Sequence, residues 1–444
     1  MSAVALTHPG AAQDATARQR RNFYHLYADI AGYGLLAGST LAFITIYAVR
    51  LGAASWQVGF LTAGPALVNL LITLPVGRWL APRPLPRMVF LSSLLHRLFY
   101  PLLIPVALFV PNATGQIWLL LAVVLLSSIP GVPLSIGFNA LFAEIVPEAW
   151  RGTVAGRRNA LLALTMLVST LLSGQILRLS EPATGYALVF VLGALGAGYS
   201  CYHLAQLRMD RRGPPSPDTA YQPLGDAARA GRPVLAPDAP LQRTFALRSL
   251  LHVPTLQPGS VLAPLRSSFG PFMLGLFFFH FAQFLPGPLF SLFWVKEARI
   301  DDAAISLLNA VHFTIMLLAS LPLGRLTRRF GNRRLVAVGS LTLAAYPLLT
   351  AVSAGMVTLL IASIVGGAVW AILGGAISNR LLERIPAGDR PRHLALYNLA
   401  LNAAILVGAM AGPALADVIG LRLGLLTSAG LRLLAGLVLW QVDR

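Results

Sequence analysis

The chain has 444 residues, of which 56% are hydrophobic and only 11% are charged, and its mean hydropathy is +0.70. Soluble domains carry about 25% charged residues, so this composition excludes an ordinary water-soluble fold. The net charge of +18 is more typical of a membrane protein's orientation signal than of nucleic-acid binding. Apolar runs of about 20 residues, the length that crosses a bilayer, recur without the alternation of strands. The composition therefore predicts an all-α integral membrane protein with no nucleic-acid partner.

The first segment of the chain, residues 1–26, is polar and lacks the separate apolar core and cleavage site of a signal peptide. It should therefore stay attached as a cytoplasmic N-terminal segment. Twelve membrane-spanning helices are predicted after it. Their windows are 27–49, 57–78, 87–110, 117–138, 156–178, 183–206, 271–295, 303–324, 333–352, 354–378, 393–417 and 421–441.

Residues 207–270 interrupt this series with prolines and scattered charges, too polar to span a membrane. They are predicted to link a bundle at 27–206 to a second bundle at 271–441, with 442–444 as the C-terminus. Within the linker, 241–251 could form an amphipathic helix on the membrane surface or stay solvated. The single cysteine, Cys201, lies in the sixth run and is assigned a packing role, so no disulfide, metal site or other cofactor site is expected.

Arginine placement predicts the orientation, because segments that stay in the cytoplasm retain more Lys and Arg. Of 34 basic residues, 27 fall in one alternating set of segments that includes both termini and the linker. Two lie within runs, Arg97 and Arg432. The opposite set contains Arg50, Arg178, Lys296, Arg299 and Arg422. Both termini are therefore predicted to be cytoplasmic, and the surplus charge should also attract anionic lipid.

Two loop motifs occur once in each half of the chain, which indicates an internal repeat. Leu74-Pro75-Val76-Gly77-Arg78 recurs as Leu321-Pro322-Leu323-Gly324-Arg325, 247 residues later. The second motif consists of four residues that have the same spacing in both copies, and the copies are 239 residues apart. The first copy is Glu144, Pro147, Arg151 and Asn159, and the second is Glu383, Pro386, Arg390 and Asn398.

At these loops the chain resembles the major facilitator superfamily of secondary transporters, over about residues 22–441. The second copy of the family's loop signature runs from Gly324 to Arg334 and departs from it at the acidic position, which holds Arg328. In the first copy Ala81 takes that position, and Pro84 replaces the second glycine. The resemblance implies two six-helix bundles related by a pseudo-two-fold axis, and an altered latch at the cytoplasmic face. It implies a secondary active transporter, expected to be a monomer, that moves a small organic solute across the inner membrane by alternating access.

Signatures for proton-coupled efflux are weak. The arginine that many proton-coupled members carry in the fourth span is absent, since 117–138 contains no charge. The antiporter pattern Gly-x-x-x-Gly-Pro occurs only in the eleventh run, at 408–413, where small residues more often indicate close helix packing. Proton-coupled efflux therefore stays one hypothesis beside an uncoupled facilitator or coupling to another ion.

Other classes of membrane protein were weighed against transport. An ATPase would need a Gly-x-x-x-x-Gly-Lys phosphate loop, and the chain's single lysine, Lys296, follows Trp294 and Val295. An enzyme would need clustered carboxylates or a nucleophile with its base at depth, whereas the 16 acidic residues fall almost wholly in loops and at span ends. A non-transporting sensor, or the permease subunit of a larger complex, remains the alternative.

Polar residues inside the runs are candidates for substrate contacts, because the membrane interior disfavours them unless they have a function. The resemblance implies that spans one, four, seven and ten line a central cavity. Few charges lie there, which favours a moderately apolar or neutral substrate. The candidates are Asp29, Tyr33, Arg97, Ser127, His280, Gln283 and Trp370.

Each of the main candidates also has a structural interpretation. Asp29, roughly 13 Å from the centre of its run at 1.5 Å per residue, could anchor the span by pairing with an inner-loop arginine. Arg97 could pack with its guanidinium on backbone carbonyls. His280 could be a satisfied interior histidine, and Trp370 a packing or interfacial aromatic residue.

Two hypotheses follow for the mechanism. Residues of the repeated loops should form a charge network that closes the cytoplasmic side, with solvated loops as the alternative. If protons are used, coupling should run through Asp29 and His280, with Arg97 tuning the carboxylate, because a histidine can change charge near neutral pH. The gate candidates are Gly77, Arg78, Glu144, Arg151, Gly324, Arg325, Glu383 and Arg390.

Overall fold

A computed structural model describes residues 9–209, 261–386 and 389–443, and every regular element in these ranges is helical. Twelve helical stretches are long and apolar enough to cross a membrane, which confirms the predicted number of spans. The predicted linker and its 241–251 segment lie mostly outside the described residues. The main difference is at the start, where the first helix begins at Pro9 and so includes polar residues before the predicted span at 27–49.

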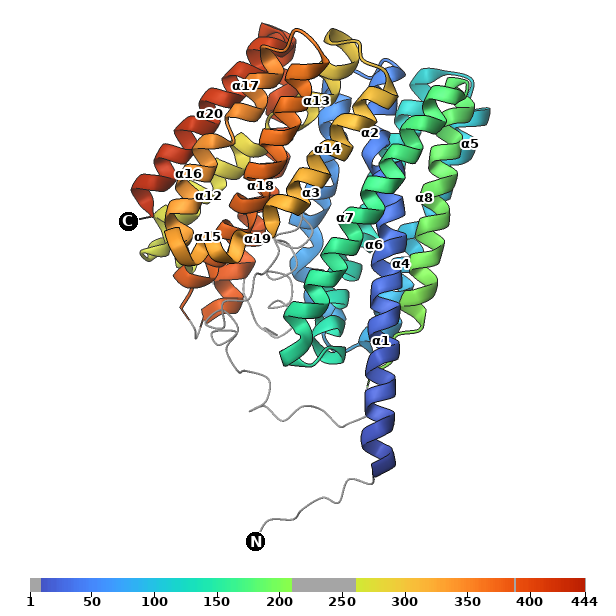
Figure 1. Ribbon diagram of the computed structural model, residues 1–444, viewed down its shortest axis with the longest axis vertical. Coiled ribbons are helices and arrows are strands. Elements are labelled where there is room, and N and C mark those ends of the chain that lie inside the picture. The colour runs from blue at the N-terminus through green and yellow to red at the C-terminus, as the bar shows by residue number, and fades with distance from the viewer. Residues whose placement is uncertain (1–8, 210–260, 387–388, 444) are drawn as a thin grey trace.

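The first half contains six spans, several of them built from shorter helices (Figure 1). The first span continues from α1 through a π-helical turn, η1, into α2, and the third joins α4 to α5 through a 3-10 turn, η2. The bounds are α1 Pro9–Leu36, η1 Ala37–Leu41, α2 Ala42–Arg50, α3 Ser55–Leu80, α4 Leu85–Leu98, η2 Tyr100–Leu102, α5 Leu103–Phe109, α6 Ala113–Ile145, α7 Glu148–Leu179 and α8 Pro182–Ala205.

The second half repeats this plan after a short 3-10 helix, η5. Its eighth span ends at Ser320, because the chain turns at Leu321 and Pro322 and starts a separate helix, α15. The predicted end at 324 was therefore too late. The bounds are η5 Ala263–Arg266, α12 Phe269–Phe284, α13 Gly287–Leu292, η6 Phe293–Glu297, α14 Asp302–Ser320, α15 Leu323–Phe330, α16 Asn332–Thr342, α17 Ala345–Ala351, α18 Met356–Arg384, α19 Arg390–Ile419 and α20 Leu421–Val442.

A third repeat becomes evident from where the helices break. Tyr100-Pro101-Leu102-Leu103 recurs as Tyr346-Pro347-Leu348-Leu349, 246 residues later, at the break between α4 and α5 and just inside α17. Proline cannot donate the backbone hydrogen bond of a continuous helix. The third span of each half is thus interrupted at the same place by the same residues.

The first-copy and second-copy loops turn differently, which explains the loss of one family glycine. Gly331, between α15 and α16, has φ of +75°, a conformation that favours glycine. Pro84, before α4, has φ of −66°, which suits proline. The substitution at residue 84 therefore accompanies a different backbone turn.

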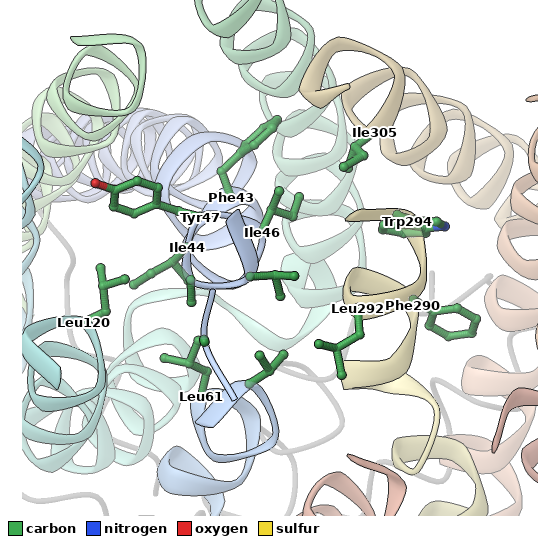
Figure 2. Close-up of a cluster of buried hydrophobic side chains, with 14 of the residues drawn as sticks. Phe43, Ile44, Ile46, Tyr47, Leu61, Leu120, Phe290, Leu292, Trp294 and Ile305 are labelled. Atoms are coloured by element: carbon green, nitrogen blue, oxygen red, sulfur yellow. The ribbon is translucent and has the colours of Figure 1, made fainter. Parts of the chain in front are cut away.

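The two halves pack side by side through α3 against α19 and α7 against α14. We call the end of the bundle where α1 begins and α20 finishes the terminal end, and the opposite end, near Arg50 and Asp302, the far end. At the far end one apolar cluster joins residues of both halves, among them Phe43, Ile46 and Leu61 with Leu292 and Ile305 (Figure 2).

At the terminal end the first half has a hydrophobic cluster of its own. Leu26, Val89, Leu141 and Leu204 pack there from α1, α4, α6 and α8. A further cluster joins both halves, with Ala66, Leu80 and Ile136 packed among residues such as Phe272, Leu394 and Tyr397. Apolar contacts therefore connect the halves at the far end and also toward the terminal end.

Candidate functional site

The strongest buried ionic cluster surrounds Asp29 on α1, and only 3% of this residue is exposed. Arg158 of α7 donates to Asp29 Oδ2 at 3.1 Å, and the Nη2 of Arg97 on α4 lies 3.6 Å from Oδ1. Ser200 of α8 donates its hydroxyl to Oδ1 at 2.5 Å. Four helices thus meet at one carboxylate, whose charge is balanced by two guanidinium groups.

Close packing of α1 on α8 brings this cluster together. A Cβ atom on Gly32 would lie 2.7 Å from the carbonyl oxygen of Gly196, and one on Gly196 would lie 2.6 Å from that of Gly32. Only glycine fits at such a backbone approach. The same seam places Ser200 against Asp29, one turn from Gly196 on α8 and from Gly32 on α1.

Arg97 is held from both sides. It donates to the hydroxyl of Ser93, one turn earlier on α4, as well as facing Asp29. Its neighbour His96 contacts the carbonyl oxygen of Ser127 on α6 through Nδ1 at 2.7 Å, and the hydroxyl of Tyr100 through Nε2 at 3.1 Å. The predicted reach of Arg97 to Asp29 is thus present in the structure, and Ser127 contributes its backbone oxygen rather than its hydroxyl to this contact.

An equivalent contact occurs in the second half. His280 of α12 is buried and its Nε2 lies 3.1 Å from the hydroxyl of Tyr397 on α19. Arg158 and Tyr397 occupy matching positions, since each precedes the repeated asparagine, Asn159 or Asn398. In each half, therefore, the fifth span contacts the first span through the same position of the repeat. The contact is an ion pair in the first half and a neutral hydrogen bond in the second.

Arg432 of α20 has a structural environment, with 1% of the residue exposed and its donors on backbone carbonyl oxygens. It donates to Gln283 and Leu343 at 3.0 Å and to Ala282 at 3.4 Å. Pro286 and Pro347 lie four residues after Ala282 and Leu343, so neither can donate the usual helical hydrogen bond to them. Arg432 thus compensates for the breaks in α12 and before α17.

The remaining predicted contact residues lie at intermediate depth. Tyr33 and Trp370 are half-buried and pack against apolar clusters, which fits the packing interpretation of Trp370. Gln283 is half-buried as well. Among the described residues, six uncharged side-chain polar atoms are buried without a hydrogen-bond partner: Thr40 Oγ1, His280 Nδ1, Gln283 Oε1, His312 Nδ1, Thr327 Oγ1 and Asn402 Oδ1. No group of three His, Cys, Asp or Glu side chains in the described ranges could hold a metal ion.

The gate candidates lie in the loops and helix ends of the terminal end, as their sequence positions require. Arg151 donates to the carbonyl oxygens of Ala143 and Val146, and Glu383 accepts from Asn332 and Arg380, so these contacts stay within one half. Arg78 and Glu144 are exposed and have partners of their own. Gly77 is buried in α3, and Gly324 and Arg325 lie in the first turn of α15. The side chain of Arg390 is outside the described set. A network across the halves stays a prediction.

At the far end, polar contacts do cross between the halves. Arg50 at the end of α2 donates to Asp302 Oδ1 through Nε and Nη2 at 3.0 and 2.9 Å, and to the Ile300 carbonyl oxygen at 2.6 Å. Tyr186 of α8 donates to Asp302 Oδ2 at 2.8 Å. We call Arg50, Asp302 and Tyr186 the far-end latch.

Sequence reasoning missed the roles of several of these residues. Arg158 was counted with the basic residues of the cytoplasmic segments, although it stands at the start of the predicted run 156–178; in the structure it lies within α7 and faces Asp29. The repeat itself carried a signal, because Arg158 stands beside the repeated Asn159. The far-end latch gave no comparable signal, since Arg50 and Asp302 lie 252 residues apart.

Comparison with known proteins agrees with this geometry. Residues 272–444 match the family model described as Major Facilitator Superfamily, and the whole bundle matches solved transporters of that fold. The second half of the chain thus matches the major facilitator superfamily, and the whole chain has the fold of its transporters. The family match and the twelve spans support an integral, multi-pass membrane protein, and point to a transporter rather than an enzyme. No curated protein matches this chain by sequence.

Solved structures similar to this chain carry chemically different solutes. A D-xylose-proton symporter matches with a TM-score of 0.68 at 16% identity, covering 95% of this chain and 97% of the other. The nucleoside transporter NupG matches at 0.62 and 11%, covering 96% and 99%. A human organic anion transporter, TETRAN, matches at 0.60 and 14%, covering 95% and 99%. At these identities the likeness shows the fold.

Proposed function

We propose that this chain is a secondary active transporter that moves a small neutral organic solute by alternating access. One observation supports the proposal most strongly. Apolar clusters join the halves along the bundle, but the ion pair of Arg50 with Asp302 crosses between them at the far end, while toward the terminal end Asp29 pairs within the first half and Asp443 pairs within the second. Such a distribution of contacts is expected of a two-bundle carrier closed on one side.

A neutral solute fits the state of the interior charges. The carboxylate of Asp29 is already paired with Arg158 and Arg97, so it offers no free counter-charge to a cationic solute, and the donors of Arg432 are occupied by backbone carbonyl oxygens. The unpartnered atoms of His280 and Gln283 could instead hydrogen-bond hydroxyl or amide groups. Xylose and nucleosides, which similar structures transport, are neutral and rich in such groups.

Proton coupling, if it operates, is assigned to Asp29, with His280 as a second candidate. A carboxylate that binds a proton loses its attraction for Arg158 and Arg97, and this would loosen α1 from α7 and α4. His280 occupies the matching interface in the second half through Tyr397. The small residues at 408–413 pack closely, since a Cβ on Gly408 would lie 2.7 Å from the Phe281 carbonyl oxygen, so they lend no support to efflux. Proton-coupled efflux therefore stays a prediction.

The orientation follows from the arginines. Since the terminal end contains both termini and most of the basic residues, we assign it to the cytoplasm and the far end to the opposite side of the inner membrane. In that orientation the far-end latch would close the side that faces away from the cytoplasm. The functional unit is taken to be a monomer surrounded by lipid, with the solute and a coupling ion as its ligands.

The test is transport by the purified protein in liposomes, with radiolabelled xylose and uridine as first probes. We expect exchange of at least one neutral solute, and accumulation under a pH gradient that Asp29→Asn abolishes while exchange persists. His280→Gln is measured beside it. If both substitutions leave gradient-driven accumulation intact, neither residue carries the proton. The direction of the effective gradient distinguishes uptake from efflux.

A protein that exchanges no solute from a broad panel of neutral and charged compounds would contradict the proposal. That result would favour the alternative of a sensor or of a permease subunit that needs a partner.

A further inference from the structure

Two histidines face each other across the seam between α1 and α8. The Nδ1 atoms of His25 and His203 are 2.8 Å apart, a hydrogen-bond distance. The residues are only 8% and 4% exposed, so these are not surface side chains. Neither histidine belongs to the sites described above.

The geometry restricts how this pair can carry protons. A hydrogen bond between two Nδ1 atoms needs one ring to donate Nδ1–H and the other to accept with its lone pair. A proton added to Nε2 of the donor ring makes an imidazolium, and the bridging proton can then move to the second ring. The second ring releases a proton from its own Nε2, so one proton enters and one leaves. Two imidazolium rings would oppose N–H to N–H and break the contact.

The pair lies directly beside Asp29. His25 precedes Asp29 by four residues on α1, and His203 follows Ser200 by three residues on α8, so the two cross-helix contacts are one turn apart on the same seam. The pair is on the side of Asp29 that faces the terminal end, because α1 begins there and α8 finishes there. A proton passing along the seam from that end would meet the histidines first.

Aromatic rings and few charges surround the pair. Edges of Tyr24, Tyr199 and Tyr202 surround the rings, with Tyr199 4.5 Å from His203 between centroids, and α8 itself contains no charged residue. Asp29 acts on His203 electrostatically, whereas Arg21 on α1 acts on His25. On the other helices packed here, the charged residues Arg158 of α7 and Arg97 of α4 pair with Asp29.

We propose that His25 and His203 form a proton relay that connects the solution at the terminal end to Asp29. This inference rests on the proposed function, since it assumes that Asp29 binds the coupled proton. It adds the route by which a carboxylate that is 3% exposed exchanges that proton. The relay sets the rate of proton exchange, whereas Asp29 and its arginines set the equilibrium.

The experiment follows protonation of Asp29 directly, without a known substrate. Purified full-length protein in liposomes is mixed rapidly from about pH 8 to about pH 4, a range that includes the ordinary titrations of histidine and aspartate, and the carboxylic acid C=O band is recorded by infrared spectroscopy. Asp29→Asn identifies the band. His25→Gln and His203→Gln should each slow its appearance roughly tenfold or more, as loss of a proton-transfer group does. The final amplitude should match that of the wild type.

Matched controls separate a relay from a structural role. His393→Gln removes another buried histidine of the terminal end, one that contacts Asp389 on its own side of the molecule, and should leave the rate unchanged. The double variant should be no slower than either single one, because the two rings act as one unit. Wild-type rates in both histidine variants would overturn the relay while leaving Asp29 as the proton site. Absence of any Asp29 band would overturn the relay and the coupling proposal together.

Discussion

Replacing Arg50 by methionine tests whether the far-end latch holds the two halves closed. Methionine retains much of the side-chain length and removes the guanidinium group. Three hydrogen bonds across the halves are lost, two to Asp302 and one to the Ile300 carbonyl oxygen, while Tyr186 still binds Asp302. The closed arrangement of the far end should therefore become less favoured relative to an open one.

The size of the effect can be worked from exposure. The Arg50 side chain is 30% exposed and that of Asp302 is 16% exposed, so the pair lies between a solvated and a buried ion pair. Solvated pairs contribute about 0.2–1 kcal/mol, and a net hydrogen bond contributes about 1 kcal/mol. We expect Arg50→Met to shift the equilibrium by about 1–2 kcal/mol, which corresponds to about a 5- to 30-fold change in the ratio of open to closed molecules.

The assay measures distances across the far end by double electron–electron resonance. Cys201 is first replaced by serine, and spin labels are attached at Thr114→Cys in α6 and Val357→Cys in α18, both exposed at that end of the bundle. We expect the population with the longer distance to increase in Arg50→Met.

Arg422→Met serves as the matched control. Arg422 pairs with Glu297 at 2.6 Å and donates to Ala351, so it is a far-end ion pair that stays within the second half. Its loss should leave the distance distribution unchanged. If Arg50→Met gives the same distribution as the control, the latch does not hold the halves together and the reasoning is refuted.

Four further predictions concern the interior and the terminal end. Asp29→Ala should lower the free energy of unfolding by about 3–5 kcal/mol, because it leaves Arg158 and Arg97 buried without a counter-ion. A melting curve in detergent measures this loss. A curve identical to that of the wild type would contradict the pairing. Arg432→Met should also be destabilising, by about 1–3 kcal/mol for each carbonyl group left unpaired, and should speed hydrogen exchange near residues 282–287. The exchange rate of Arg432→Lys should fall between those of Arg432→Met and the wild type. Equal exchange in all three proteins would exclude a role of Arg432 in pairing these carbonyl groups. Reporter fusions after Pro111 and after Arg266 should give opposite signals, since these residues lie at opposite ends of the bundle, and matching signals would defeat the topology. Glu144→Gln combined with Glu383→Gln should bias the protein toward the inward-open state without preventing insertion; unchanged accessibility of cysteines placed on α12 would count against the charge network.

Hydropathy determined the number of spans, and the loop repeats indicated the division into halves. Each of these features is local or periodic, so it can be found without knowing which helices touch. The helices extend beyond the predicted windows where they continue through polar residues, as in α1 from Pro9 and in α7 from Glu148. A helix buried against neighbours tolerates charged residues that a hydropathy window excludes.

Tertiary structure alone decided which polar residues meet. Asp29 was a candidate from its position, but its partner Arg158 lies 129 residues away and was counted among the basic residues of the cytoplasmic segments. The histidine pair, 178 residues apart, gave no pattern at all. The histidine contact depends on Gly32 and Gly196, where α1 and α8 approach closely, and Gly34 and Gly38 allow the corresponding approach of the first span to α7. The sequence by itself determined which segments enter the membrane, since transfer of each helix depends on its own composition, whereas the contacts between helix faces depend on side-chain shape across the whole bundle.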